Sequence, residues 1–109
     1  MVMLEIKKVN AKDLKPDSLI LDVRTDDEVK EKSLSLPFLH HDSATIDVGE
    51  FIKKHHLDKN KTLNILCKTG KRAMDVAKKF LDEGYKNVQV IEGGLEKAEK
   101  DGVKIKIGK

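Results

Sequence analysis

Segments with the pattern of strands alternate with segments with the pattern of helices along this chain, and this alternation restricts the folds open to it. Residues 19–23, 63–66 and 88–91 form short, mainly apolar runs with the length of buried parallel strands. After the second run, apolar residues recur at helical spacing; they are Ala73, Met74, Val76, Ala77, Phe80 and Leu81. The alternation predicts an α/β domain with a mostly parallel sheet and helices on both faces.

Two further helices are predicted from their N-terminal signals. Thr25 and Glu28 have the spacing of a capping box, which predicts a helix over residues 26–32. Asp47 and Glu50 repeat this spacing and predict another helix, which ends at about His56. Ligands of such folds usually bind beyond the carboxyl ends of the strands, so we expect the functional site there.

The remaining segments are assigned from their local pattern. Residues 5–9 predict a short first strand, and residues 95–100 predict a short helix. Residues 103–107 alternate strictly between apolar and charged side chains, which predicts a half-exposed edge strand. Residues 33–43 show little periodicity and contain Pro37, so we predict a loop there.

The size and charge of the chain restrict its function. Its 109 residues fit a single domain spanning 1–109. The 22 Lys and Arg residues are interspersed with 19 Asp and Glu, and aromatic residues make up 4%, which argues against a nucleic-acid surface. The first residues meet a charge too early for a signal peptide, and no apolar run approaches the roughly 20 residues of a bilayer span. We therefore expect a cytoplasmic protein without nucleic-acid or membrane partners.

Cys67 is the single cysteine of the chain. A lone cysteine excludes an intrachain disulfide and a zinc site built from several thiolates. Adjacent histidines occur at residues 40–41 and 55–56. Neighbours on a helix point about 100° apart, so such a pair does not readily share one metal ion. We expect no metal and no cofactor, and a reducing compartment would keep the thiol available.

Cys67 lies where a predicted strand passes into a predicted helix. The loop that follows reads Lys-Thr-Gly-Lys-Arg over residues 68–72 and brings three cations within five residues of the thiol. Cations, loop N–H groups and the positive end of the following helix all stabilise a thiolate relative to a thiol. Gly70 lets the loop curl without a side chain in the pocket. The loop is therefore predicted to hold an ionised sulfur.

The cationic side chains of this loop point to an anionic substrate. Arg72 could hold a donor such as thiosulfate, and Lys68 and Lys71 would attract it. Once a thiolate exists, its attack on a sulfane sulfur requires no general base. The lack of an obvious His or Asp partner beside Cys67 is consistent with that chemistry.

Several motifs of the chain, taken together and in order, resemble the single-domain rhodaneses, a family of sulfurtransferases. An Asp-Val-Arg-x-x-x-Glu element, a Cys-x-x-Gly-x-Arg active loop and a closing Gly-Tyr-x-x-Val and Gly-Gly segment are typical of that family. The matching positions are residues 21–24 with Glu28, residues 67–72, Gly84 and Tyr85 with Val88, and Gly93 with Gly94. The similarity runs from about residue 19 to residue 102.

The resemblance implies a fold and a mechanism. It implies a three-layer domain whose five-stranded parallel sheet lies between helices. It implies a persulfide on Cys67, loaded by thiosulfate or polysulfide and unloaded by a thiol, cyanide or protein acceptor. It implies that Asp22 and Arg24 support the pocket. The substrate-binding residues implied by the active loop, through side chains or backbone N–H groups, are Lys68, Thr69, Gly70, Lys71 and Arg72.

Three positions depart from the family pattern. Residues 32–37 replace the usual Gly-His-Ile-x-Gly-Ala stretch, so the loop beside the site is expected to differ. Ala73 stands where serine is common, and Ala98 stands where tryptophan often follows the double glycine. The nucleophile and its loop are retained.

Two other functions compete with sulfur transfer. Cysteine-based phosphatases use Cys-x5-Arg, but here that position is Ala73 and Arg72 comes one residue earlier. A ring that is one residue smaller should cradle a sulfur better than a phosphate. The second alternative is a rhodanese module that carries sulfur without turnover or binds a regulatory partner, and measurement of persulfide formation separates these readings.

Overall fold

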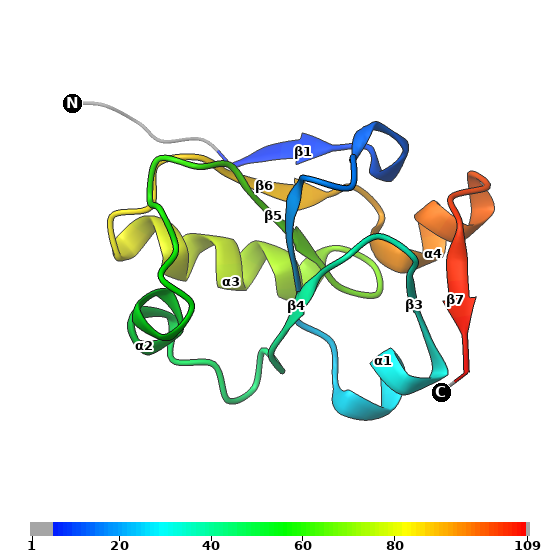
Figure 1. Cartoon of the computed structure of the whole chain (residues 1–109), viewed down its shortest axis with the longest axis horizontal. Coiled ribbons are helices and arrows are strands. Elements are labelled where there is room, and N and C mark those ends of the chain that lie inside the picture. Colours follow the sequence, from blue (N-terminus) through cyan, green and yellow to red (C-terminus); the bar gives the residue numbers. More distant parts are fainter. Residues whose placement is uncertain (1–5, 109) are drawn as a thin grey trace.

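The computed structural model describes residues 6–108, and its central feature is a five-stranded sheet in which all neighbouring strands are parallel (Figure 1). The strand order is β1-β6-β5-β2-β4. In chain order these strands are β1 (Lys7–Val9), β2 (Leu19–Asp22), β4 (Leu39–His40), β5 (Leu63–Leu66) and β6 (Val88–Ile91). The α/β prediction is confirmed; Glu5, predicted to begin the first strand, lies outside the described residues.

Helices cover both faces of the sheet, as predicted. They are η1, a 3-10 turn (Ala11–Asp13), α1 (Asp26–Glu31), α2 (Val48–Lys54), α3 (Lys71–Asp82) and α4 (Gly94–Lys100). Within residues 6–108, none of these helices has the length and apolar character that a bilayer crossing requires.

The faces are separated by the alternation of side chains along the strands. On β2, Leu21 packs with the buried faces of α2 and α3, which include Phe51 and Phe80. Its neighbour Ile20 points the other way and packs with η1 and with Leu95 of α4. The sheet therefore packs between two helical layers through two apolar clusters, one on each face. Burial of these clusters stabilises the strands whose carboxyl ends carry the site.

The prediction of a loop over residues 33–43 is wrong. The segment contains most of β3 (Lys32–Leu34) and all of β4, which supplies the fifth strand of the sheet. β3 pairs antiparallel with β7 (Ile105–Ile107) in a separate two-stranded sheet. Strands of two or three residues are too short to show periodicity, so only their long-range partners define them. The strand predicted at 103–107 is present as β7, which covers only residues 105–107 and lies outside the parallel sheet.

Candidate active site

The predicted site residues gather where β2 and β5 end. These two strands are adjacent and parallel, and Asp22 is paired with Leu66 at their carboxyl ends. Cys67 follows directly and opens a loop that leads into α3. The loop turns at Gly70, whose φ of 109° lies in the left-handed region and which caps the helix. The topology therefore places the lone thiol at the edge where ligands of such sheets bind.

The sulfur of Cys67 lies inside the turn of this loop. The residue is 1% exposed, and its Sγ accepts N–H groups from Gly70 at 2.9 Å and from Ala73 at 3.4 Å. Gly70 belongs to the predicted cradle of residues 68–72, but Ala73 lies one residue beyond it. The Ala73 N–H is free to point at the sulfur because the first N–H groups of a helix have no partner within the helix. Two backbone dipoles thus favour negative charge on the sulfur.

The start of α4 forms hydrogen bonds with the loop that begins at Cys67. The N–H of Leu95 donates to the carbonyl of Cys67 at 2.9 Å, and that of Glu96 donates to Lys68 at 3.2 Å. This approach requires glycine at position 94, because a Cβ there would overlap the carbonyls of Cys67 and Lys68. The double glycine therefore fixes the loop against the second helical layer.

Asp22 and Arg24 form a buried ion pair beside the loop. Arg24 donates from Nε and Nη2 to the Asp22 carboxylate at distances of 2.8–3.1 Å, and both residues are at most 3% exposed. Arg24 also donates to the carbonyls of Glu28 at 3.3 Å and Lys32 at 2.7 Å. The pair ties the end of β2 to the middle and the C-terminal end of α1, and the supporting role of Asp22 and Arg24 stays a prediction.

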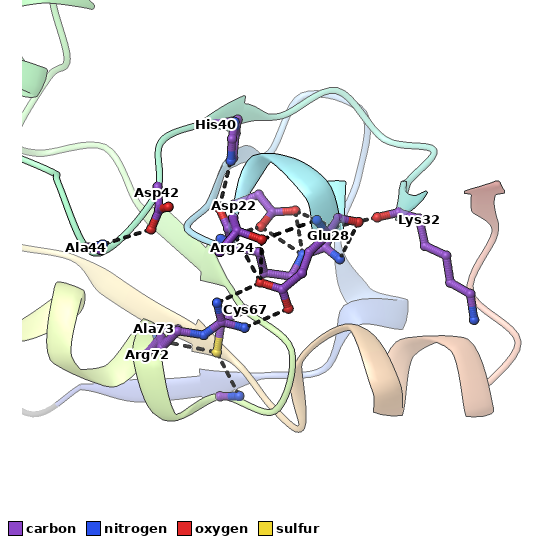
Figure 2. A network of polar contacts seen from close by, with 12 residues as sticks. Asp22, Arg24, Glu28, Lys32, His40, Asp42, Ala44, Cys67, Arg72 and Ala73 are labelled. Atoms are coloured by element: carbon purple, nitrogen blue, oxygen red, sulfur yellow. Dashed lines mark hydrogen bonds and ion pairs between the residues drawn. The ribbon is translucent and has the colours of Figure 1, made fainter. Parts of the chain in front are cut away.

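Arg72 is paired with a residue that the sequence did not identify as part of the site. Its Nη1 and Nη2 donate to Oε1 and Oε2 of Glu28 at 2.8 and 3.0 Å (Figure 2). This contact lowers the pKa of Glu28 from 4.5 to about 2 and raises the pKa of Arg72. From the sequence, Glu28 is predicted to cap a helix and to belong to the Asp-Val-Arg-x-x-x-Glu motif. Its place in that motif is the one sequence signal that could have assigned it to the site.

The other loop residues line two different cavities. Lys68 borders a cavity of about 380 Å³ between α1 and α4, together with Glu28 and Leu95. Thr69, Gly70 and Lys71 border a second cavity of about 340 Å³. The loop thus borders two cavities, and its two lysines line different ones.

Comparison with known proteins identifies the family. The Rhodanese-like domain matches residues 6–101. The protein YtwF of Bacillus subtilis (strain 168), provisionally named a sulfurtransferase, is 32% identical over 99 residues, which cover 84% of this chain and 89% of that protein. The polysulfide-sulfur transferase homodimer from Wolinella succinogenes has a TM-score of 0.74 and 25% identity, over 93% of this chain and 78% of that one. A rhodanese-related protein from Thermoplasma volcanium has a TM-score of 0.70 and 22% identity, over 92% and 97%. The chain therefore belongs to the rhodanese-like family.

Proposed function

We propose that this protein is a sulfurtransferase that carries a sulfane sulfur on Cys67 as a persulfide. The observation that supports it best is the position of Sγ, which lies inside a turn and accepts two backbone N–H groups. Such a turn stabilises the negative charge of a thiolate and of a terminal persulfide sulfur. The family and the two sulfurtransferase-named relatives support the same reading.

The proposed reaction has two displacement steps. The Cys67 thiolate attacks the outer sulfur of thiosulfate, a new S–S bond forms, the old one breaks, and sulfite leaves with the electron pair. An acceptor such as cyanide then attacks the terminal sulfur, and the Cys67 thiolate leaves. Polysulfide would load the enzyme in the same way, with a shortened polysulfide as leaving group. Neither step requires a cofactor or a protein base.

A second candidate is a sulfur carrier that loads but releases slowly. The low exposure of Cys67, 1%, favours this candidate, because an acceptor has to reach a sulfur that lies within the turn. The Glu28 carboxylate on Arg72 favours it as well, since a donor meets an arginine that is already paired.

Intact-mass measurement tests both candidates. The protein is incubated with thiosulfate or with polysulfide, desalted, weighed, and then treated with cyanide. A gain of one sulfur atom that cyanide removes supports sulfur transfer, and rapid release separates an enzyme from a carrier. The Cys67→Ser variant is the matched control. Uptake of sulfur by that variant, or no uptake by the wild type from either donor, would refute the proposal.

A further inference from the structure

We propose that Glu28 sets the charge preference of the site: by neutralising Arg72, it disfavours dianionic donors such as thiosulfate relative to donors that carry one charge. This inference rests on the proposed sulfur transfer, because it concerns the donor that reaches Cys67. The evidence is the geometry of the Glu28 carboxylate and of the charges around the sulfur.

The Glu28 carboxylate is held in place from two directions. Both of its oxygens accept from Arg72, as described above, and Oε1 also accepts from the N–H of Thr25 at 3.0 Å and from its hydroxyl at 3.1 Å. Thr25 Oγ1 in turn accepts from the Glu28 N–H, which completes the capping box of α1. Rotation of the Glu28 side chain away from Arg72 would therefore also break its two hydrogen bonds with Thr25, which form one half of the capping box.

The Arg72 guanidinium lies between Cys67 Sγ and the Glu28 carboxylate (Figure 2). An unpaired arginine there would offer one positive charge to an incoming anion, but the pair of Arg72 and Glu28 has no net charge. A donor that displaced Glu28 would leave its carboxylate, which is 29% exposed, without its strongest partner. The remaining loop cations, Lys68 and Lys71, have exposed side chains, so solvent and salt screen them.

The electrostatic cost of this arrangement scales with the charge of the donor. Removing one negative charge near the sulfur should favour a monoanion by about threefold and a dianion by the square of that factor, about tenfold. Thiosulfate and benzenethiosulfonate both donate their outer sulfur, and they release sulfite and benzenesulfinate, respectively. Thiosulfate carries two negative charges, whereas benzenethiosulfonate carries one. Their ratio of kcat/KM therefore reports the charge preference of the site.

The test compares the wild type with two variants on α1. Glu28→Gln removes the charge but keeps an oxygen that accepts the capping hydrogen bonds, because glutamine also completes a capping box. Glu31→Gln is the matched control: its exposed side chain borders the same cavity and makes no ion pair within residues 6–108. Both variants remove one negative charge from the same helix, but only the first unpairs Arg72.

Two readouts are measured for each protein. The first is the ratio of kcat/KM for thiosulfate to that for benzenethiosulfonate. The second is the ratio of Cys67 alkylation rates by iodoacetate and iodoacetamide, which differ by one charge and require no sulfur transfer. Relative to the wild type, we expect both ratios to rise about threefold in Glu28→Gln and to be unchanged within experimental error in Glu31→Gln. In 1 M salt, which screens the charges, the ratios of the three proteins should become equal.

The outcomes separate this inference from the proposed function. If the wild type takes up sulfur but Glu28→Gln leaves the donor ratio unchanged, the inference is overturned and sulfur transfer stands. If the alkylation ratio rises but no protein takes up sulfur, the control of anion access by Glu28 stands and the proposed function is refuted. An equal rise in Glu31→Gln also overturns the inference, because net charge alone would then explain it.

Discussion

The ion pair between Glu28 and Arg72 should make the stability of the domain depend on pH in acid. Arg72 holds the pKa of Glu28 at about 2 instead of 4.5. At about 1.4 kcal/mol for each pH unit, this difference corresponds to at most ~3.5 kcal/mol of folding free energy. Because Glu28 and Arg72 are 29% and 35% exposed, solvent screening reduces the expected contribution to about 1–2 kcal/mol.

The sign follows from the lowered pKa. A carboxylate that is easier to ionise in the folded state binds fewer protons there than in the unfolded state. Its contribution is therefore fully present above pH 4.5 and is lost as the pH falls toward 2. The Glu28→Gln variant lacks this term at every pH, while its amide oxygen keeps the capping function.

Urea unfolding followed by far-ultraviolet circular dichroism measures the effect. Wild type, Glu28→Gln and Glu31→Gln are compared at pH 7, 5, 3 and 2. We expect Glu28→Gln to be less stable than wild type by about 1–2 kcal/mol at pH 7 and the two to converge near pH 2. A difference between them that stays constant from pH 7 to pH 2 would show that the ion pair is not its source. Glu31→Gln should follow the wild type throughout.

Three further substitutions test the site and its support. Cys67→Ser should abolish thiosulfate:cyanide transfer and sulfur loading while the circular dichroism spectrum stays native, whereas unchanged activity would remove the assignment of the nucleophile. Gly94→Ala should lower transfer at least tenfold, because its methyl group would overlap the backbone of the loop after Cys67. Gly102→Ala is the control, since Gly102 also has positive φ but open space around it. Equal losses of activity in the two variants would contradict the steric argument. Arg24→Ala leaves Asp22 buried without its partner and should cost about 3–5 kcal/mol in urea unfolding, a loss that the double variant with Asp22→Ala should partly restore if the unpaired charge is the cause.

Predictions from local pattern agree with the structure where one segment carries its own signal. The capping box at Thr25 and Glu28 begins α1, and apolar spacing from Ala73 to Leu81 identifies the buried face of α3. These features depend on contacts between residues three or four positions apart. Their order along the chain then predicts the parallel sheet, because strands joined through helices run parallel.

The pairing of the short strands required the tertiary structure. β3 and β4 have three and two residues, and each becomes a strand only through a partner, β7 for the first and β2 for the second. Neither segment is long enough to show an alternating pattern. The free energy that orders them comes from distant hydrogen bonds and from burial of Leu34 in the second apolar cluster.

By itself, the amino-acid sequence determined the α/β class and the placement of Cys67 at a strand end, within a loop rich in N–H donors and cations. Only the tertiary structure decided what surrounds the sulfur: the N–H of Ala73, the support from α4, and the carboxylate of Glu28, which lies 44 residues before Arg72 in the chain. The reason is that charge and periodicity are local properties of a chain. Which opposite charges meet depends on how the helices pack on the sheet.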